Sequence, residues 1–291
     1  MIQRVTMPKC GLSRVIAGVG EEVPVGGTIA LLAPEGTADA ELDEAAQQAR
    51  EEIDAGAVAD VPGPVTGTVE VDGRRLAYAT LGAEGDVVVL VHGYGGDKNS
   101  WLFVQEPLSQ SRVVHALDLP GHGESTKDVG DGSLDTLADA VIGFLDALGI
   151  ERAHLVAPAG FGDAINAEYL RGFATATSRR ELKPHLTALF AAPGLVTRQL
   201  ADDLLKYKRL DGVDKVLTTL LGTLLDGDAP GIDAAPLLST VDIPVRVVWG
   251  RADAVLPPEN GAGLPDVRYV DDAGHLVHLE APGAVVAAIT A

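Results

Sequence analysis

The feature of this chain that most constrains its fold is a series of short apolar runs, each followed by a turn. Val87–Val91 precedes the glycine-rich stretch His92–Gly96, and Val113–Leu117 precedes Asp118–Ser125. An apolar run without alternation is typical of a strand covered on both faces. Further strands are predicted at Val69–Val71, Leu76–Ala79, His154–Val156, Val245–Trp249 and Val267–Val270. Because helical segments lie between these strands, the chain is predicted to have an α/β fold on a mainly parallel sheet.

Two stretches between the predicted strands have helical patterns. Ser133 can cap a helix that Gly149 ends. Its predicted apolar stripe comprises Leu134, Leu137, Ala138, Val141, Ile142, Leu145 and Leu148. A second stretch, from about residue 163 to residue 235, lacks strand signal. Its leucines recur at helical spacing, and ordinary core helices would explain them: Leu200, Leu204, Leu205, Leu217, Leu220, Leu221, Leu224 and Leu225.

Composition divides the chain into three parts. Residues 1–33 hold strand-like pieces and several glycines. Asp39–Ile53 is rich in alanine, glutamate and glutamine and predicts a short acidic helix, and Asp60–Pro64 predicts a flexible hinge. We therefore expect an acidic linker over residues 34–66, and the larger domain over residues 67–291.

The balance of charge excludes some partners. Lys and Arg number 22 against 42 Asp and Glu, a formal net charge of −20. Nucleic acid and anionic membrane need a basic face, so neither is expected as a partner. No apolar run is long enough to cross a bilayer, and no leader opens the chain. The single cysteine, Cys10, fits a reducing cytoplasm and is interpreted as a small apolar residue near a strand end.

Four motifs follow predicted strands: His92–Gly96, Asp118–Ser125, Trp249–Asp253 and Ala273–His275. In this order, each at the end of a strand-like run, they resemble the α/β-hydrolase superfamily. The resemblance implies a nucleophile in a G-x-S-x-G turn between a strand and a helix, followed along the chain by an Asp and a His. It also implies that the helical stretch at about residues 163–235 is a lid over the site.

The resemblance implies that Asp253 and His275 are the catalytic acid and base. The acid fixes the imidazole tautomer and stabilises the imidazolium that forms when the base takes a proton. The two residues follow consecutive strands at one sheet edge, so we expect them within hydrogen-bonding reach. The small-residue turn at Gly93 and Tyr94 can direct backbone N–H groups at an oxyanion, and the Tyr94 amide is the implied donor.

Other polar residues near these motifs are interpreted as structural. Ser125 shapes the second loop, His122 is a hydrogen-bonding residue of that loop, and His278 is a wall or surface residue. No metal site is predicted.

The nucleophile is missing from its expected place. After His154–Val156 the chain continues as Ala157–Asp163, and Ala159 would hold the serine position if the turn were only mutated. A deletion explains the sequence better. A βαβ crossover takes at least a dozen or so residues, and here the strand is followed within a few residues by lid-like sequence.

Further stretches of sequence indicate which family of the α/β-hydrolase superfamily the chain resembles. Thr6–Ser13 looks like the opening of a lipoyl domain, and Gly18–Ala33 like its closing half. Other stretches match the hydrolase domain, namely Asn99–Phe103, Pro158–Gly162, Arg179–Pro184 and Leu204–Leu210. Together they resemble the dihydrolipoamide acetyltransferase subunit of bacterial acetoin dehydrogenase complexes, which has a lipoyl domain, a linker and an α/β-hydrolase domain. Intact members carry lipoate on the lysine of a D-K hairpin.

Departures from that family remove two reactive groups. The hairpin with the lipoyl lysine is absent, and Lys9 belongs to the opening motif instead. The cofactor prediction is therefore none, and residues 1–33 are a truncated lipoyl-like remnant. The resemblance implies a small acyl or carbonyl substrate and other subunits of a 2-oxo acid dehydrogenase-type complex as partners. Three interpretations remain open: an impaired acyltransferase component, a non-catalytic small-molecule binder, and a His/Asp-dependent hydrolase or lyase without a covalent intermediate.

Overall fold

A computed structural model describes residues 10–17, 28, 30–34, 37–54, 63–158 and 160–291. Contacts divide the chain into two units, Met1–Gly63 and Pro64–Ala291. Half of the predicted lipoyl opening at Thr6–Ser13, most of Gly18–Ala33 and most of the predicted hinge lie outside the described residues. No helix in the described part of the chain has both the length and the apolar character needed to cross a membrane.

The first unit contains a hairpin and a helix. Strands β1 (Cys10–Val15) and β2 (Ala30–Pro34) pair antiparallel. The predicted acidic helix is confirmed as α1 (Asp39–Asp54). Arg14 of β1 forms ion pairs with Asp39 and Asp43, each at 2.9 Å, so the helix is fastened to the hairpin. This differs from the predicted linker, since residues 39–54 associate with the N-terminal strands.

The second unit begins with the predicted hairpin. Strands β3 (Val65–Val71) and β4 (Arg74–Leu81) pair antiparallel and are joined by Asp72 and Gly73. Both turn residues have positive φ, 48° and 74°. Two such residues form a turn whose twist matches that of the flanking strands, and Asp-Gly is well suited to it.

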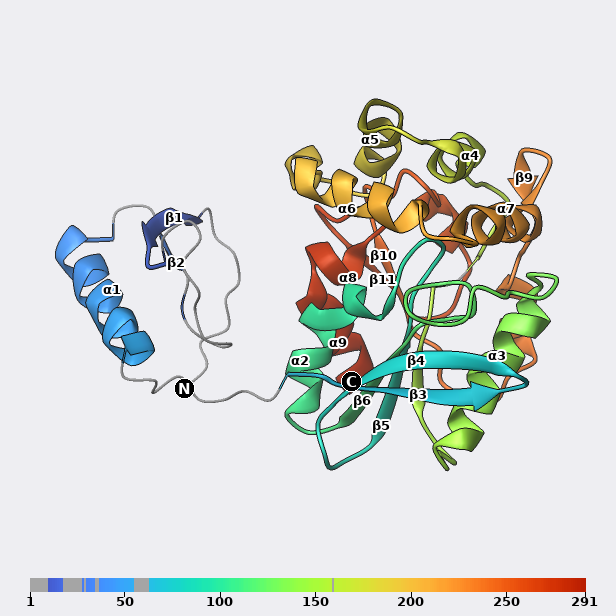
Figure 1. Cartoon of the computed structure of the whole chain (residues 1–291), viewed down its shortest axis with the longest axis horizontal. Coiled ribbons are helices and arrows are strands. Elements are labelled where there is room, and N and C mark those ends of the chain that lie inside the picture. The colour runs from blue at the N-terminus through green and yellow to red at the C-terminus, as the bar shows by residue number, and fades with distance from the viewer. Residues whose placement is uncertain (1–9, 18–27, 29, 35–36, 55–62, 159) are drawn as a thin grey trace. The chain divides into compact units, whose positions relative to one another are not determined.

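The main sheet has the order β3-β4-β6-β5-β7. Figure 1 labels β3, β4, β5 and β6 of this sheet. Its inner strands β5 (Val87–Val91) and β6 (Val113–Leu117) have the predicted bounds, and β7 (His154–Val156) closes the order. Strand β5 is parallel to both β6 and β7, whereas β4 is antiparallel to β6. The sheet is therefore mixed: β5, β6 and β7 are parallel, as the apolar runs predicted, and the hairpin β3–β4 adds to them antiparallel.

Helices cover the two faces of this sheet. Val88 and Leu90 pack on one side with the helices α2 (Leu102–Ser109) and α9 (Pro282–Thr290), and a 3₁₀ turn, η1 (Lys98–Trp101), leads into α2. Val89 and Val91 pack on the other side against α3 (Leu134–Ala147).

The sheet is interrupted beyond β7. Strands β10 (Val247–Gly250) and β11 (Val267–Val270) form a parallel sheet of their own. Leu155 of β7 pairs with Val89, so it lies on the α3 side of the sheet, and it is 57% exposed. The strand next to the predicted deletion is therefore uncovered on that face.

Helix α3 confirms the predicted caps but only part of the predicted stripe. The Ser133 hydroxyl accepts a hydrogen bond from Thr136 N–H, and Gly149 has a φ of +66° just beyond the helix. Ala140 and Phe144 form the buried face, whereas Leu134 and Ile142 are exposed. Apolar residues lie on more than one face of this helix, so periodicity alone did not identify the face that packs on the sheet.

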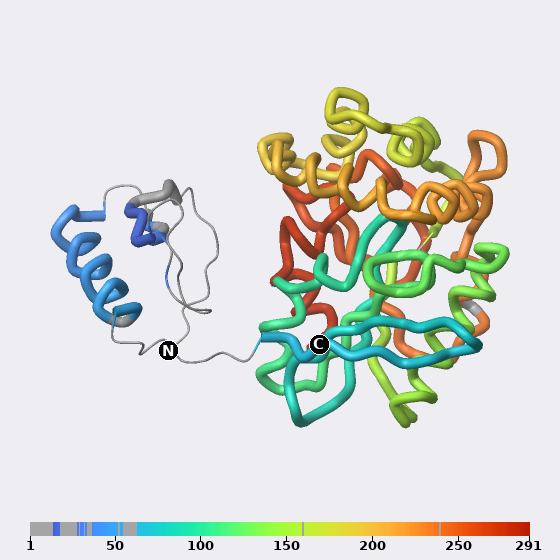
Figure 2. Tube along the Cα trace, in the orientation of Figure 1, coloured from blue at the N-terminus to red at the C-terminus, as the bar shows by residue number. Residues whose placement is uncertain are grey.

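The predicted lid is helical. It comprises α4 (Ala167–Thr175), α5 (Arg179–Thr187), α6 (Arg198–Lys208) and α7 (Val213–Leu224). These helices form a layer at the top of the larger unit in Figure 2. They share a core of their own that includes Leu170, Leu186, Leu205 and Leu217. The leucines therefore pack mainly within the lid.

Short elements complete the unit. A 3₁₀ turn, η2 (Pro193–Leu195), lies between α5 and α6, and the two-residue strands β8 (Leu225–Asp226) and β9 (Ala229–Pro230) follow α7. The 3₁₀ turns η3 (Ala235–Ser239) and η4 (Pro258–Gly261) flank β10, and α8 (Val277–Glu280) precedes α9.

Candidate active site

Asp253 and His275 form a hydrogen-bonded pair, as the sequence predicted. His275 Nδ1 lies 3.0 Å from Asp253 Oδ2, and the other carboxylate oxygen accepts hydrogen bonds from Val255 N–H and Leu256 N–H. The side chain of Asp253 is 5% exposed and that of His275 is 27% exposed. A carboxylate accepts, so in the neutral ring Nδ1 carries the proton and Nε2 is left as the acceptor, the arrangement that a general base requires.

The parallel pairing of β10 and β11 brings the two residues together. Asp253 lies three residues beyond β10 and His275 five beyond β11, at the carboxyl ends of neighbouring strands. A backbone hydrogen bond of 2.9 Å from Ala252 N to Ala273 O joins the two loops. The loops pass so close that a Cβ on Gly250 would lie 2.1 Å from Gly274 O, so only glycine fits there.

The turn after β5 has an unpaired donor. Gly96 N–H closes the turn on Gly93 O at 3.0 Å. Tyr94 N–H has no acceptor among the described residues, whereas its phenol donates to Leu217 O at 3.0 Å. Burial raises the pKa of the Tyr94 phenol, which therefore stays a donor. The role of Gly93 and Tyr94 in an oxyanion hole stays a prediction.

The segment after β7 leads directly into the lid. Gly160 O accepts from Ala234 N–H at 2.7 Å, and Asn260 Nδ2 donates to Phe161 O and Ala164 O, each at 2.8 Å. No helix occurs among the described residues between Val156 and Ala167. Within the described part of the chain, no serine or cysteine side chain hydrogen-bonds to His275.

Ser125 is structural, as predicted. It is buried, and its hydroxyl donates to Asp118 O at 2.7 Å and accepts from Ala77 N–H at 2.8 Å. The hydroxyl thus donates to and accepts from backbone groups that are distant in sequence from the acid–base pair. Neither hydrogen bond involves His275. The alternative that Ser125 replaces the missing nucleophile is not supported.

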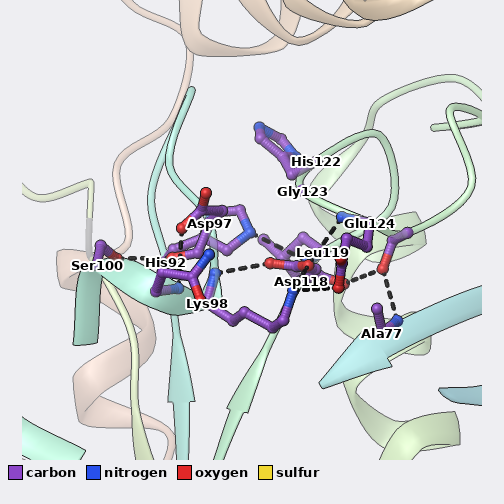
Figure 3. Close-up of polar contacts among 12 residues, drawn as sticks. Ala77, His92, Asp97, Lys98, Ser100, Asp118, Leu119, His122, Gly123 and Glu124 are labelled. Carbon is purple, nitrogen blue, oxygen red and sulfur yellow. Dashed lines mark hydrogen bonds and ion pairs between the residues drawn. The ribbon is translucent and has the colours of Figure 1, made fainter. Parts of the chain in front are cut away.

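A buried ion pair holds the same loop in place (Figure 3). The carboxylate of Asp118 accepts hydrogen bonds from Lys98 Nζ at 2.9 Å, Lys98 N at 2.6 Å and Glu124 N at 2.9 Å. Lys98 Nζ also pairs with Glu124 at 2.7 Å. Burial alone would lower the pKa of Lys98, but the hydrogen bonds to Glu124 and Asp118 raise it overall. This pair could not be predicted from the sequence, because Lys98 carries no motif signal.

His92 and His122 are neutral structural residues. Their ring centroids are 4.7 Å apart. His92 Nε2 accepts from Leu119 N–H at 3.1 Å and His122 Nε2 accepts from Gly95 N–H at 3.3 Å, while each Nδ1 faces a backbone carbonyl. Burial lowers both pKa values, that of His122 to about 3. The prediction that His122 is a hydrogen-bonding loop residue is confirmed.

His278 packs against the indole ring of Trp101. Its ring lies 4.5 Å from that of Trp101, at an angle of 33°. Burial, with smaller contributions from His275 and His92, lowers the pKa of His278 to about 4. Within the described ranges, no group of three or more His, Cys, Asp or Glu side chains could hold a metal ion.

A family comparison agrees with this geometry. The model of the "Alpha/beta hydrolase family" matches residues 88–289, from β5 to the end of α9. The chain belongs to the α/β hydrolase family. A serine hydrolase of this fold from Cycloclasticus zankles superposes with a TM-score of 0.68 at 20% identity, covering 77% of this chain and 96% of the other.

Two curated relatives narrow the family. The chain is 40% identical to the "dihydrolipoyllysine-residue acetyltransferase component of acetoin cleaving system" of Pseudomonas putida, over 93% of this chain and 80% of the relative. It is 37% identical to the component of the same name from Cupriavidus necator, over 95% and 82%. This α/β hydrolase is therefore a member of the family of those components, as the sequence motifs predicted.

The length of the first of these alignments bears on the predicted deletions. It extends over 300 residues, yet it takes in only 93% of a chain of 291 residues. The relative therefore has residues at positions where this α/β hydrolase has none. This agrees with the prediction that segments are missing inside the chain.

Proposed function

We propose that this protein is a component of an acetoin-cleaving system whose α/β-hydrolase domain keeps its acid–base pair but forms no acyl-enzyme. Two relatives named as acetyltransferase components of an acetoin-cleaving system match nearly the whole chain. In the reaction that the fold implies, a serine attacks a carbonyl, His275 with Asp253 moves the proton, and the Tyr94 amide holds the oxyanion. The protein has the acid–base pair and a Tyr94 N–H without an acceptor among the described residues, and it lacks the serine at the expected turn.

The observation that carries this proposal is the path of the chain from β7 into the lid. The nucleophile of this fold lies on a turn between a strand and a helix. Here the chain passes from Val156 to α4 along Ala234 and Asn260, and no helix occurs between β7 and α4 in the described residues. A serine at position 159 alone would lack the helix whose N-terminal end helps to stabilise an oxyanion.

We predict that a fluorophosphonate probe does not label this protein and that p-nitrophenyl acetate is not turned over through a covalent intermediate. The physical reason is that no hydroxyl or thiol of the described residues hydrogen-bonds to His275, so none is activated by it. Mass spectrometry after incubation measures labelling, with an active serine hydrolase as the positive control. Stoichiometric labelling of one serine, lost in His275→Ala, would overturn the proposal and identify the nucleophile.

The intact pair favours a second candidate, a hydrolase or lyase that uses His275 as a base without a covalent intermediate. His275 Nε2 has no hydrogen-bond partner among the described residues, and the side chain is partly exposed. Such an enzyme would show pH-dependent turnover that is lost in His275→Ala and insensitive to serine-directed inhibitors.

The remaining assignments follow from the relatives and the sequence. We propose a cytoplasmic location, a small acyl or carbonyl ligand, and other subunits of the acetoin-cleaving system as partners. Lipoate does not fit this chain. Lys9 is the only lysine in residues 1–63, it belongs to the opening motif, and it lies outside the described residues.

We predict that the chain is not lipoylated, because its sequence lacks the D-K hairpin whose lysine carries lipoate in intact members. Intact-mass measurement after expression with lipoate and the ligase tests this, with an intact lipoyl domain as the positive control. A mass increase matching one lipoyl group would contradict the prediction.

A further inference from the structure

The start of the lid is fastened to the loop that carries Asp253. Asn166 caps α4, and its backbone N–H donates to Val255 O at 2.8 Å. Its side-chain amide donates to Ala254 O at 2.9 Å. Because Val255 N–H donates to the Asp253 carboxylate at 2.8 Å, Asn166 holds the loop that surrounds the acid.

The far end of the α4–α5 segment is fastened to the loop that carries His275, and Glu280 makes this connection. Its Oε1 accepts from Ala191 N–H at 3.0 Å and from Ala192 N–H at 3.3 Å. Its Oε2 accepts from Gly274 N–H at 2.7 Å and from Ala191 N–H at 3.2 Å. One carboxylate thus joins three backbone donors from two segments, and hydrogen bonds to a carboxylate are stronger than neutral ones.

Close packing makes this connection stiff. Leu276 N–H donates to Leu189 O at 3.2 Å, so the His275 loop and the end of the lid segment are also joined through backbone atoms. A Cβ on Gly274 would lie 2.7 Å from Ala191 N, and one on Gly250 would lie 2.1 Å from Gly274 O. The His275 loop is therefore packed between the end of β10 and the lid, with no room to shift alone.

We propose that Glu280 is a positioning residue for His275, and that Asn166 has the corresponding role for Asp253. Glu280 fastens Gly274, the residue before His275, to the end of the α4–α5 segment. Through the hydrogen bonds of Glu280 and Asn166, the lid and the acid–base pair move together. A ligand that shifts α4–α5 therefore also changes the His275–Asp253 hydrogen bond. This deepens the proposed function, because it identifies what holds the pair that the protein retains.

The test uses Glu280→Gln in the full chain. Glutamine keeps one acceptor oxygen but places an amide donor against the N–H groups of Gly274 or Ala191. We expect amide exchange of residues 189–192 and 273–276 to become about tenfold to a hundredfold faster, as the loss of a charge-assisted hydrogen bond implies. We also expect the low-field proton resonance of His275 Nδ1–H to shift or broaden. Glu280→Asp, which keeps the charge, should retain part of the wild-type signal.

The matched control is Glu259→Gln, an exposed glutamate of η4, which should leave both measurements unchanged. An unchanged resonance in folded Glu280→Gln, even with a lower stability, would show a merely structural role and overturn the proposal. If Glu280→Gln does not fold, the same resonance in Glu280→Asp decides. Neither readout depends on turnover, so the outcome is separate from that of the fluorophosphonate experiment.

Discussion

Asp118→Asn is expected to lower the free energy of unfolding by about 3–5 kcal/mol, the usual effect of breaking a buried ion pair by removing one partner. The carboxylate of Asp118 is fully buried and accepts three hydrogen bonds from Lys98 and Glu124. After the substitution the buried Lys98 ammonium keeps only one charged partner, Glu124, whose side chain is 71% exposed. Urea unfolding at neutral pH, followed by circular dichroism, measures the loss.

Two further variants sharpen this test. Asp86→Asn removes an exposed carboxylate 3.6 Å from Arg112 and should cost less than about 1 kcal/mol. Lys98→Met combined with Asp118→Asn should recover part of the loss, because it removes the unpaired charge. A loss below about 1 kcal/mol in Asp118→Asn itself would show that water or Glu124 satisfies Lys98, and the proposed importance of the pair would be wrong.

Stability is expected to fall as the pH drops below about 6.5, the ordinary pKa of histidine. In the folded protein, burial lowers the pKa of His122 to about 3. A histidine whose pKa is lower in the folded state than in the unfolded state makes its full contribution to stability above the unfolded pKa. That contribution is lost as the pH falls, because the unfolded chain binds the proton first. For His122 alone the loss between about pH 6.5 and about pH 5 is on the order of 2 kcal/mol.

The measurement is the free energy of unfolding at about pH 7 and about pH 5. His122→Gln keeps an amide that can face Gly95 N–H or Pro120 O, and it should reduce the pH-dependent loss by roughly the amount expected for His122. The control is His154→Gln at the exposed start of β7, which should keep the wild-type dependence. His92, whose pKa burial also lowers, adds to the same loss. Equal pH dependence in His122→Gln and wild type would rule out this assignment.

The strands could be predicted from sequence where the local signal and the tertiary context agree. Val87–Val91 and Val113–Leu117 are covered on both faces, so unbroken apolar sequence marked their ends correctly. The strand predicted at Val245–Trp249 begins only at Val247, because its partner β11 begins at Val267 and pairs with that residue. A strand extends only as far as its neighbour, and the length of a neighbour is not a local property.

The candidate site divides in the same way. Asp253 and His275 follow strands, so sheet geometry alone places them at one edge, and their hydrogen bond could be predicted. Asn166 could have been predicted as a helix N-cap, since Asn before an apolar helical run is a common N-cap. Glu280 carried none, because its partners are backbone N–H groups in segments that only the folded chain brings together.

The uncovered edge at β7 has a consequence for how copies of this protein behave in a crowded solution. Among the described strands β7 pairs only with β5, and Leu155 is exposed on its surface. Unpaired strand edges are templates for pairing with another chain, and short length and charge are common safeguards. Strand β7 has three residues, and the chain has a net charge of −20. Salt screens the charge repulsion between copies. The colloidal stability of the protein therefore depends on the strand edge that the predicted deletion leaves exposed at β7.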